Sequence, residues 1–228
     1  LIFAGMGKIL LLALALAAQS LGKRVTVVAD GFTGPAQYPF LPAYDVKPTL
    51  AGLQQFQIKV KLDRTPLAQL SYSATPQELT VVLVPKQGAW TAADVRTETS
   101  DYQYDLIAVV GAADRDSLGS IYADHRDFFF RTPTIAIDHH AANDGFGQYR
   151  LADVTAAATA ELVYRLLDEW RVALDKPIAT CLLAGIIEAT RSFRDPRTTP
   201  ATLAAASALE EFGFSSSSLL LASLEELH

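Results

Sequence analysis

The N-terminal stretch constrains the fold most, because it predicts a strand, a helix and a second strand in direct succession. Leu1–Ala4 is a short apolar run typical of a buried strand, and Ile9–Leu21 is rich in Leu and Ala, which are strong helix formers. Gly22 suits the end of that helix, and Arg24–Ala29 predicts a second buried strand. Such a unit implies a parallel sheet with a right-handed crossover.

The same stretch also has the profile of a signal peptide, with Met6-Gly7-Lys8 ahead of the apolar run Ile9–Ala18. That run is about ten residues long, which is too short to span a membrane. We therefore expect a helix of the folded protein and no membrane partner. Because Leu1 already lies in an apolar run, we expect further residues upstream of it.

In the middle of the chain the pattern changes from continuous apolar runs to alternation. Phe56–Leu62 alternates strictly between apolar and polar residues, and Leu70–Ser73 and Leu79–Val84 predict two further strands separated by Thr-Pro turn signals. We predict an antiparallel β meander, inserted at about residues 54–86 into a parallel-sheet domain. Its exposed edge suggests the hypothesis of a homodimer formed through this insert.

Buried strands return after the insert at Asp105–Gly111 and Thr132–Asp138. The segment Gly31–Pro48 is rich in Pro and Gly and predicts a loop. Helices are expected at Asp116–Tyr122, Val154–Trp170, Ile178–Thr190, Ala201–Phe212 and Leu219–Leu227. The predicted fold is α/β: a parallel-sheet domain over residues 1–213 with helices on both faces, then a C-terminal helix within 214–228 that is a candidate linker to a further domain.

Composition excludes several classes of protein. Half of the 228 residues are hydrophobic and 19% are charged, which rules out a disordered chain or a coiled coil. The net charge of −6 argues against broad electrostatic binding to nucleic acid, although it leaves local basic patches open. Cys181 is the one cysteine, which excludes a disulfide framework and a multi-cysteine zinc site and favours the cytoplasm. It lies in an apolar helical run and is expected to be a buried core thiol.

The most informative residues for chemistry are Asp138, His139 and His140, which directly follow a buried strand. Ligands of open α/β sheets bind beyond the carboxyl ends of the strands. A carboxylate and two imidazoles there are ligands for Mn²⁺ or a similar divalent ion, with Asp138 and His139 as the core of a single weak site. The alternative is that all three are ordinary polar loop residues.

The order of several segments resembles the DHH phosphoesterase family, which includes RecJ-like exonucleases, nanoRNase/pAp phosphatases and exopolyphosphatase-like proteins. These segments are DLIAVVG, TIAIDHH, TAAATAELVYRLL and IATCLLAGIIEATRSF. The resemblance covers most of Leu1–Gly213 apart from the insert. Its most specific parts are Gly185-Ile186, Ser192-Phe193 and the ending Thr198-Thr199-Pro200.

The resemblance implies hydrolysis of phosphate esters by two metal ions, which several carboxylates hold. In the family these come from four places: a loop after the first strand, the end of the strand before the DHH strand, the DHH motif, and a helix just before the Thr of the last segment. Here the first loop reads Gly5-Met6-Gly7-Lys8 and has no carboxylate. Gly111 ends the strand before the DHH strand, where the resemblance implies an Asp, and Ala189 stands in place of the Asp before Thr190. Only the DHH motif remains, and one carboxylate cannot neutralise two dications.

Rescue of the metal site by neighbouring carboxylates is conceivable. Asp114 and Asp116 lie just past Gly111, and Glu188 adjoins Ala189. A shift of one residue along a helix turns a side chain by about 100°, so Glu188 is expected to point away. The glycine-rich C-terminal substrate domain that the family usually carries has no match here.

What remains is binding of a phosphate group. Gly7 and Lys8 open a helix, whose free N–H groups favour anions, and Arg191, Arg194 and Arg197 lie in a loop that the resemblance places near the site. With His139 and His140 they would make a cationic pocket for a nucleotide or an oligonucleotide end. The alternative is that these arginines are surface residues paired with Glu188 and Asp195.

Three hypotheses therefore stand. The leading one is a catalytically degenerate DHH phosphoesterase-like protein that binds a phosphate, a nucleotide or a protein partner and needs no metal cofactor. The second is an active Mn²⁺-dependent phosphoesterase that hydrolyses short oligonucleotides or pAp with a rearranged metal site. The third is a structural interaction protein without a small ligand.

Overall fold

The computed structural model describes residues 2–5, 8–31, 41–141 and 145–212, and it divides into two units. The first, which we call the sheet domain, comprises residues 1–51 and 104–228, and the second, which we call the insert, runs from Gly52 to Gln103. The predicted bounds of the insert, 54–86, were too short at the C-terminal side.

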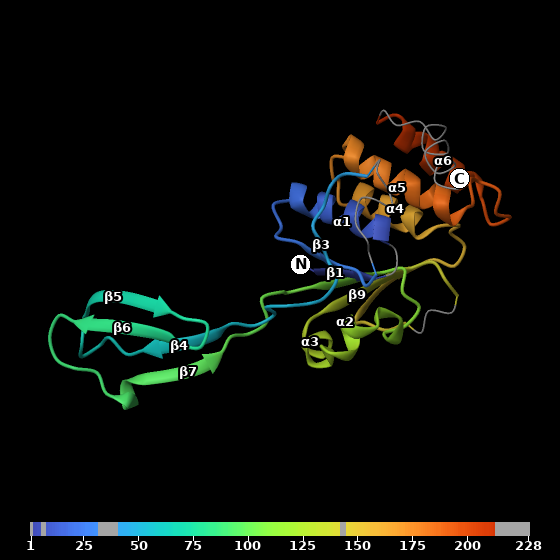
Figure 1. Cartoon of the computed structure of the whole chain (residues 1–228). Coiled ribbons are helices and arrows are strands. Elements are labelled where there is room, and N and C mark those ends of the chain that lie inside the picture. Colours follow the sequence, from blue (N-terminus) through green and yellow to red (C-terminus); the bar gives the residue numbers. More distant parts are fainter. Residues whose placement is uncertain (1, 6–7, 32–40, 142–144, 213–228) are drawn as a thin grey trace. The chain divides into compact units, whose positions relative to one another are not determined.

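The sheet domain is built on six parallel strands in the order β10-β9-β8-β1-β2-β3. Helices α1 and α4 lie on one face of this sheet, with α5 and α6 packed outside them, and α2 and α3 lie on the other face (Figure 1). The α/β class, the parallel sheet and the helices on both faces are thereby confirmed. The strands are β1 Ile2–Gly5, β2 Thr26–Val28, β3 Val46–Lys47, β8 Ile107–Val110, β9 Thr134–Asp138 and β10 Tyr149–Ala152.

The predicted helices differ from the observed ones mainly at their ends. Helix α4 begins only at Thr159, because residues 153–158 form the turn that leads into it. The short helix α3 and strands β3 and β10 were not predicted, and β3 lies within the segment Gly31–Pro48 that was predicted to be a loop. The predicted helix Leu219–Leu227 lies outside the described residues. The helices are α1 Lys8–Ser20, α2 Ser120–Ala123, α3 Arg126–Arg131, α4 Thr159–Glu169, α5 Lys176–Ala189 and α6 Pro200–Glu210, with a short 3-10 helix η3 at Asp116–Leu118.

Helix α1 is a core helix of the sheet domain, as its apolar run predicted. Most of its residues from Ile9 to Ala18 are buried, and it packs against α5, which is buried from Ile178 to Ile187. Gly185 allows this close approach, since a Cβ atom there would lie 2.7 Å from Cδ2 of Leu10. No helix in the described part of the chain is both long enough and apolar enough to cross a bilayer.

The insert is antiparallel, as predicted, but its strands do not form a three-stranded meander. Strand β4 (Phe56–Val60) pairs with β7 (Val95–Thr99), which was not predicted, and β5 (Leu67–Ala74) pairs with β6 (Leu79–Pro85). A short 3-10 helix, η2 (Ala92–Asp94), precedes β7.

The two Thr-Pro signals explain this difference in pairing. Thr75 begins a true hairpin turn, in which its N–H donates to the carbonyl of Glu78 at 2.8 Å. Thr65 instead is buried, and the carbonyl of Pro66 accepts a hydrogen bond from the N–H of Lys86 at 2.8 Å. The Thr65-Pro66 pair therefore continues the ladder of β5 and β6 and does not turn β4 onto β5.

Candidate functional site

The carboxyl ends of three neighbouring strands meet at one edge of the sheet. Gly5 at the end of β1 lies in register with Val110 of β8, and Val110 lies in register with Ile137 of β9. Beyond this pair the N–H of Gly111 donates to the carbonyl of Ile137 at 2.9 Å. Strand order reverses at β1, so this edge is a topological switch point, where open α/β sheets bind their ligands.

Asp138 ends β9 at this edge, and His139 and His140 follow it, as the sequence predicted. Oδ1 of Asp138 accepts hydrogen bonds from the backbone N–H of His139 at 2.9 Å and from Nδ1 of His140 at 2.8 Å. Asp138 and His139 are buried, whereas His140 is exposed. One ligand atom from each residue lies within 4.8 Å of the others, which makes them a candidate cluster for one metal ion.

The surroundings of His139 keep its imidazole neutral near pH 7. Burial is the main cause that lowers the pKa of His139 from 6.5 to about 4. Electrostatic interactions with His140 and Arg197 lower it further, whereas the Asp138 carboxylate opposes the shift. Nδ1 of His139 lies 2.8 Å from Oγ1 of Thr159, the first residue of α4. A neutral imidazole with one nitrogen held by a second residue is the usual state of a histidine ligand.

Within the part of the chain that the structure describes, the donor set at this edge fits one divalent ion and does not fit two. Gly5 ends β1 and Gly111 directly follows β8, which lies between β1 and β9, and neither glycine offers a side-chain ligand. Ala189 at the end of α5 offers none either. A pair of divalent ions needs several carboxylates, and Asp138 alone supplies one.

The carboxylates considered for rescue do not join this cluster. Oδ1 of Asp114 accepts a hydrogen bond from the N–H of Ser117 at 2.7 Å, so it caps the local turn. Asp116 and Glu188 are exposed. Among the described residues, Asp138, His139 and His140 make the one group of His, Cys, Asp or Glu side chains close enough to hold an ion.

Of the residues that were predicted to bind phosphate, only some lie at the same edge. Lys8 begins α1, and its Nζ donates to the carbonyl of Gly31 at 3.1 Å. Gly7 lies outside the described residues. Arg191 and Arg194 are exposed, and Nε of Arg194 donates to the carbonyl of Arg191 at 3.1 Å, which stabilises their own turn.

The turn after α5 is unusual, because three consecutive residues other than glycine have left-handed backbone angles. These are Arg191, Ser192 and Phe193, with φ values of 49°, 61° and 64°. The buried hydroxyl of Thr190 accepts a hydrogen bond from the N–H of Phe193 at 3.0 Å, which holds the turn together. Such backbone conformations are costly and concentrate at functional sites.

Arg197 is an arginine whose charge affects His139. It contributes to the lowered pKa of His139. Its Nε also donates to Oδ1 of Asp195 at 3.1 Å, and this pairing keeps the pKa of Asp195 low. The expectation that Asp195 pairs with a surface arginine therefore holds for Arg197.

Sequence reasoning missed Thr159 and Glu161, which connect the start of α4 to its surroundings. The buried carboxylate of Glu161 accepts hydrogen bonds from the N–H groups of Ala157 and Ala158 at 3.0 and 3.1 Å. It also accepts one from the hydroxyl of Thr202 in α6 at 3.0 Å. A glutamate three residues into a helix is a known start signal, which here would have placed the beginning of α4 correctly.

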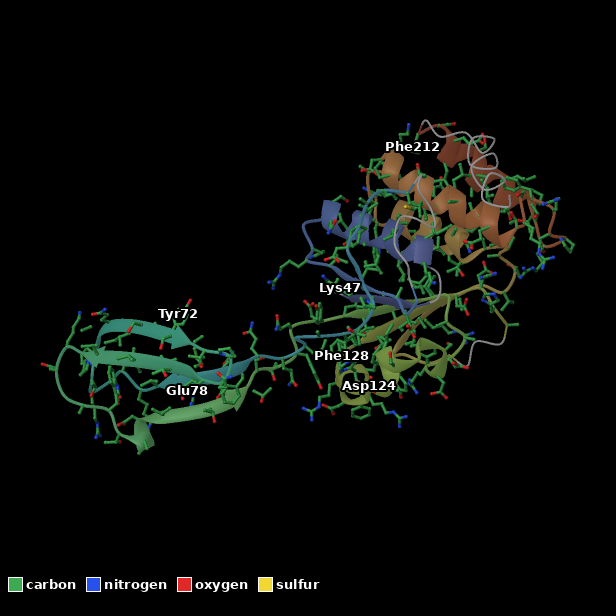
Figure 2. The ribbon with its side chains drawn as sticks, viewed as in Figure 1. Lys47, Tyr72, Glu78, Asp124, Phe128 and Phe212 are labelled. Atoms are coloured by element: carbon green, nitrogen blue, oxygen red, sulfur yellow. The ribbon has the colours of Figure 1, made fainter. Side chains whose placement is uncertain are left out.

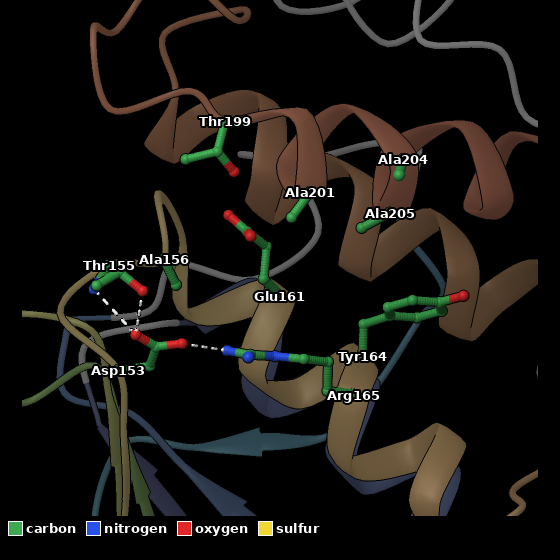
Figure 3. Close-up of a pocket in the computed structure, with 10 residues that line it drawn as sticks. All are labelled: Asp153, Thr155, Ala156, Glu161, Tyr164, Arg165, Thr199, Ala201, Ala204 and Ala205. Carbon is green, nitrogen blue, oxygen red and sulfur yellow. Dashed lines mark hydrogen bonds and ion pairs between the residues drawn. The ribbon is translucent and has the colours of Figure 1, made fainter.

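A cavity of about 450 Å³ lies next to Glu161, between the 153–156 turn, α4 and α6. Figure 3 shows Glu161 pointing toward α6, while Asp153 is bound by Thr155 and Arg165 on the opposite side. Nη2 of Arg165 lies 2.7 Å from Oδ2 of Asp153, and these contacts lower the pKa of Asp153 to about 2. Asp153, Thr155 and Arg165 therefore bind one another, and Glu161 is held by the groups described above, which gives these polar side chains of the cavity wall a structural role.

Comparison with known proteins finds partial relatives. No protein-family model matches the chain. It is 42% identical over 79 residues to the bifunctional oligoribonuclease and PAP phosphatase NrnA of Thermus thermophilus, covering 35% of this chain and 24% of that protein. It is 30% identical over 131 residues to the protein of the same name from Bacillus subtilis, covering 55% and 39%. The alignments thus span between a quarter and two fifths of the relatives' length.

A solved structure matches over nearly the whole chain. The exopolyphosphatase-related protein from Bacteroides fragilis superposes with a TM-score of 0.55 and 15% sequence identity, over 96% of this chain and 53% of that one. At this level of identity the match establishes a shared fold, and it agrees with the parallel-sheet architecture described above.

Proposed function

Over the segments that these relatives share, the chain is a member of the DHH phosphoesterase family, and from this premise we propose that it binds a phosphate-bearing nucleotide ligand without hydrolysing it by two-metal chemistry. The proposal rests on one observation. At the edge where β1, β8 and β9 end, Gly5 and Gly111 offer no side-chain ligand, and among the described residues the candidate metal cluster holds a single carboxylate, that of Asp138.

Charge at this edge favours an anion over a pair of cations. Lys8 lies at the start of α1, whose free N–H groups attract anions. Its ammonium group has three N–H donors, of which the carbonyl of Gly31 takes one. Arg197 lies near enough to affect His139. A phosphate group would neutralise part of this positive charge.

The relatives suggest which phosphate esters to test. Their names give oligoribonuclease and PAP phosphatase activity, so a short oligoribonucleotide and PAP are the first candidate ligands. We place this binding in the cytoplasm, because a single cysteine needs no oxidising compartment.

Binding of PAP and of a 5′-phosphorylated dinucleotide by calorimetry tests the proposal, with Lys8→Ala and Arg197→Ala as variants. Lys23→Ala is the matched control, since Lys23 is an exposed lysine beyond the other end of α1. We expect saturable binding that weakens in the first two variants and is unchanged in the control.

Hydrolysis is measured in the same samples with added Mn²⁺. Turnover that disappears in His139→Ala would overturn the proposal in favour of an active phosphoesterase with a rearranged site. Absence of both binding and turnover would overturn it in favour of a structural interaction protein.

A further inference from the structure

The β5–β6 hairpin of the insert has one entirely apolar face. Cross-strand partners share a face, and the register pairs Leu70 with Leu83, Tyr72 with Val81 and Ala74 with Leu79. These pairs alternate along the hairpin with more polar ones, such as Ser71 with Val82 and Ser73 with Thr80. The residues of the first three pairs therefore form a continuous apolar surface on one face of the hairpin, which we call the apolar strip.

The apolar strip is exposed to an unusual degree. The exposed fractions are 57% for Leu70, 73% for Tyr72, 60% for Leu79 and 44% for Val81. Figure 2 labels Tyr72 on this hairpin, with Glu78 at its turn. An isolated two-stranded hairpin is only marginally stable in water, and an exposed apolar face of this kind marks an interaction surface.

Charge along the hairpin indicates what covers the strip. Between Leu67 and Pro85 the sequence carries one charged residue, Glu78, at the turn. The opposite end of the hairpin is flanked by Lys86 and by Arg64 with Asp63, so it is positive. Lack of basic residues on the hairpin disfavours a nucleic acid partner.

We propose that the apolar strip packs against the same strip of a second copy of this chain, with the two hairpins antiparallel across a two-fold axis. In this arrangement Glu78 of each copy lies over the Lys86 end of the other, so opposite charges meet twice, whereas a parallel arrangement would bring like charges together. A two-fold interface requires such a self-complementary surface.

The net charge of the insert supports a second copy as the partner. The insert has as many basic as acidic residues, whereas the whole chain has a net charge of −6. Two inserts therefore meet without net repulsion, and the negative charge lies on the sheet domain. The basic residues are Lys59, Lys61, Arg64, Lys86 and Arg96, and the acidic ones are Asp63, Glu78, Asp94, Glu98 and Asp101.

Sedimentation equilibrium of the full chain at several concentrations tests the proposal, and a dimer is expected. Tyr72→Glu would bury a carboxylate without a partner, so the dimer dissociation constant should rise by about tenfold or more. Ser71→Glu is the matched control, because Ser71 is exposed on the same strand but on the opposite face. It should change the constant little.

Charge reversal tests the antiparallel orientation. Glu78→Lys and Lys86→Glu should each weaken the dimer, and the two changes together should restore it. These residues are exposed, so folding, followed by circular dichroism, should be unaffected. A monomer at all concentrations would overturn the proposal, as would a dimer unaffected by Tyr72→Glu. A monomer that binds lipid vesicles through Tyr72 would also overturn it. Nucleotide binding at the sheet domain is a separate measurement.

Discussion

Removal of the Glu161 side chain should destabilise the sheet domain strongly. In Glu161→Ala the N–H groups of Ala157 and Ala158 lose their acceptor, and both residues are buried. A buried donor without a partner costs about 1–3 kcal/mol. The hydroxyl of Thr202 keeps a second partner in Thr199, at 2.9 Å. Two lost acceptors therefore predict a loss of about 2–6 kcal/mol in the free energy of unfolding.

The cavity beside Glu161 sets where in this range the result should fall. Water entering it would partly satisfy the freed N–H groups, so we expect about 3 kcal/mol. Glu161→Gln keeps a carbonyl oxygen as acceptor and should cost about 1–2 kcal/mol, because it loses only the charge. Glu169→Ala, an exposed glutamate at the other end of α4, should stay within about 0.5 kcal/mol of the wild type.

Urea unfolding of the full chain measures these differences, and an unchanged slope with urea would show that the denatured state is unaffected. The reasoning would be refuted if Glu161→Ala lost less than about 1 kcal/mol. It would also be refuted if Glu161→Gln were as damaging as Glu161→Ala, since the acceptor oxygen would then be irrelevant.

Three further predictions concern packing, pH and thiol chemistry. Gly185→Ala should cost about 1–3 kcal/mol in urea unfolding, because its Cβ would collide with Leu10, and an unchanged midpoint would contradict the packing. The lowered pKa of Asp153 means that its hydrogen bonds from Thr155 and its pairing with Arg165 stabilise the fold above the unfolded pKa near 3.9, and that this contribution is lost as pH falls through about 2. The stability difference between wild type and Asp153→Asn should therefore shrink between these pH values; a constant difference would argue against it. Burial raises the pKa of Cys181 to about 12, so Ellman's reagent should label the native chain slowly and the unfolded chain fast; equal rates would contradict burial.

Much of the sheet domain could be predicted from the sequence, because its parallel strands are buried on both faces and read as continuous apolar runs. Strand β8 and helix α1 are examples, with every β8 residue buried. Strands that have few apolar residues or are mostly exposed escaped prediction. Val95–Thr99 has one apolar residue, and Tyr149–Ala152 lies at the edge of the sheet and is mostly exposed.

The site could be predicted only where it is local in sequence. Asp138, His139 and His140 are adjacent, and the motif identified them. Thr159 contacts His139 from 20 residues away, and Glu161 contacts Thr202 from 41 residues away. Such contacts depend on how α4 packs, which the sequence pattern does not specify. The pairing of the insert escaped prediction for a related reason, since Thr65-Pro66 resembles a turn but continues the β5–β6 ladder.

The number of manganese ions bound per chain tests the central claim most directly. Native mass spectrometry of the full chain after equilibration with Mn²⁺ should show at most one ion, lost in a His139→Ala variant, because Asp138 supplies the one carboxylate of the cluster. Two ions per chain, bound together with turnover of PAP, would contradict the claim and establish a hydrolase whose second metal ion is held by ligands elsewhere.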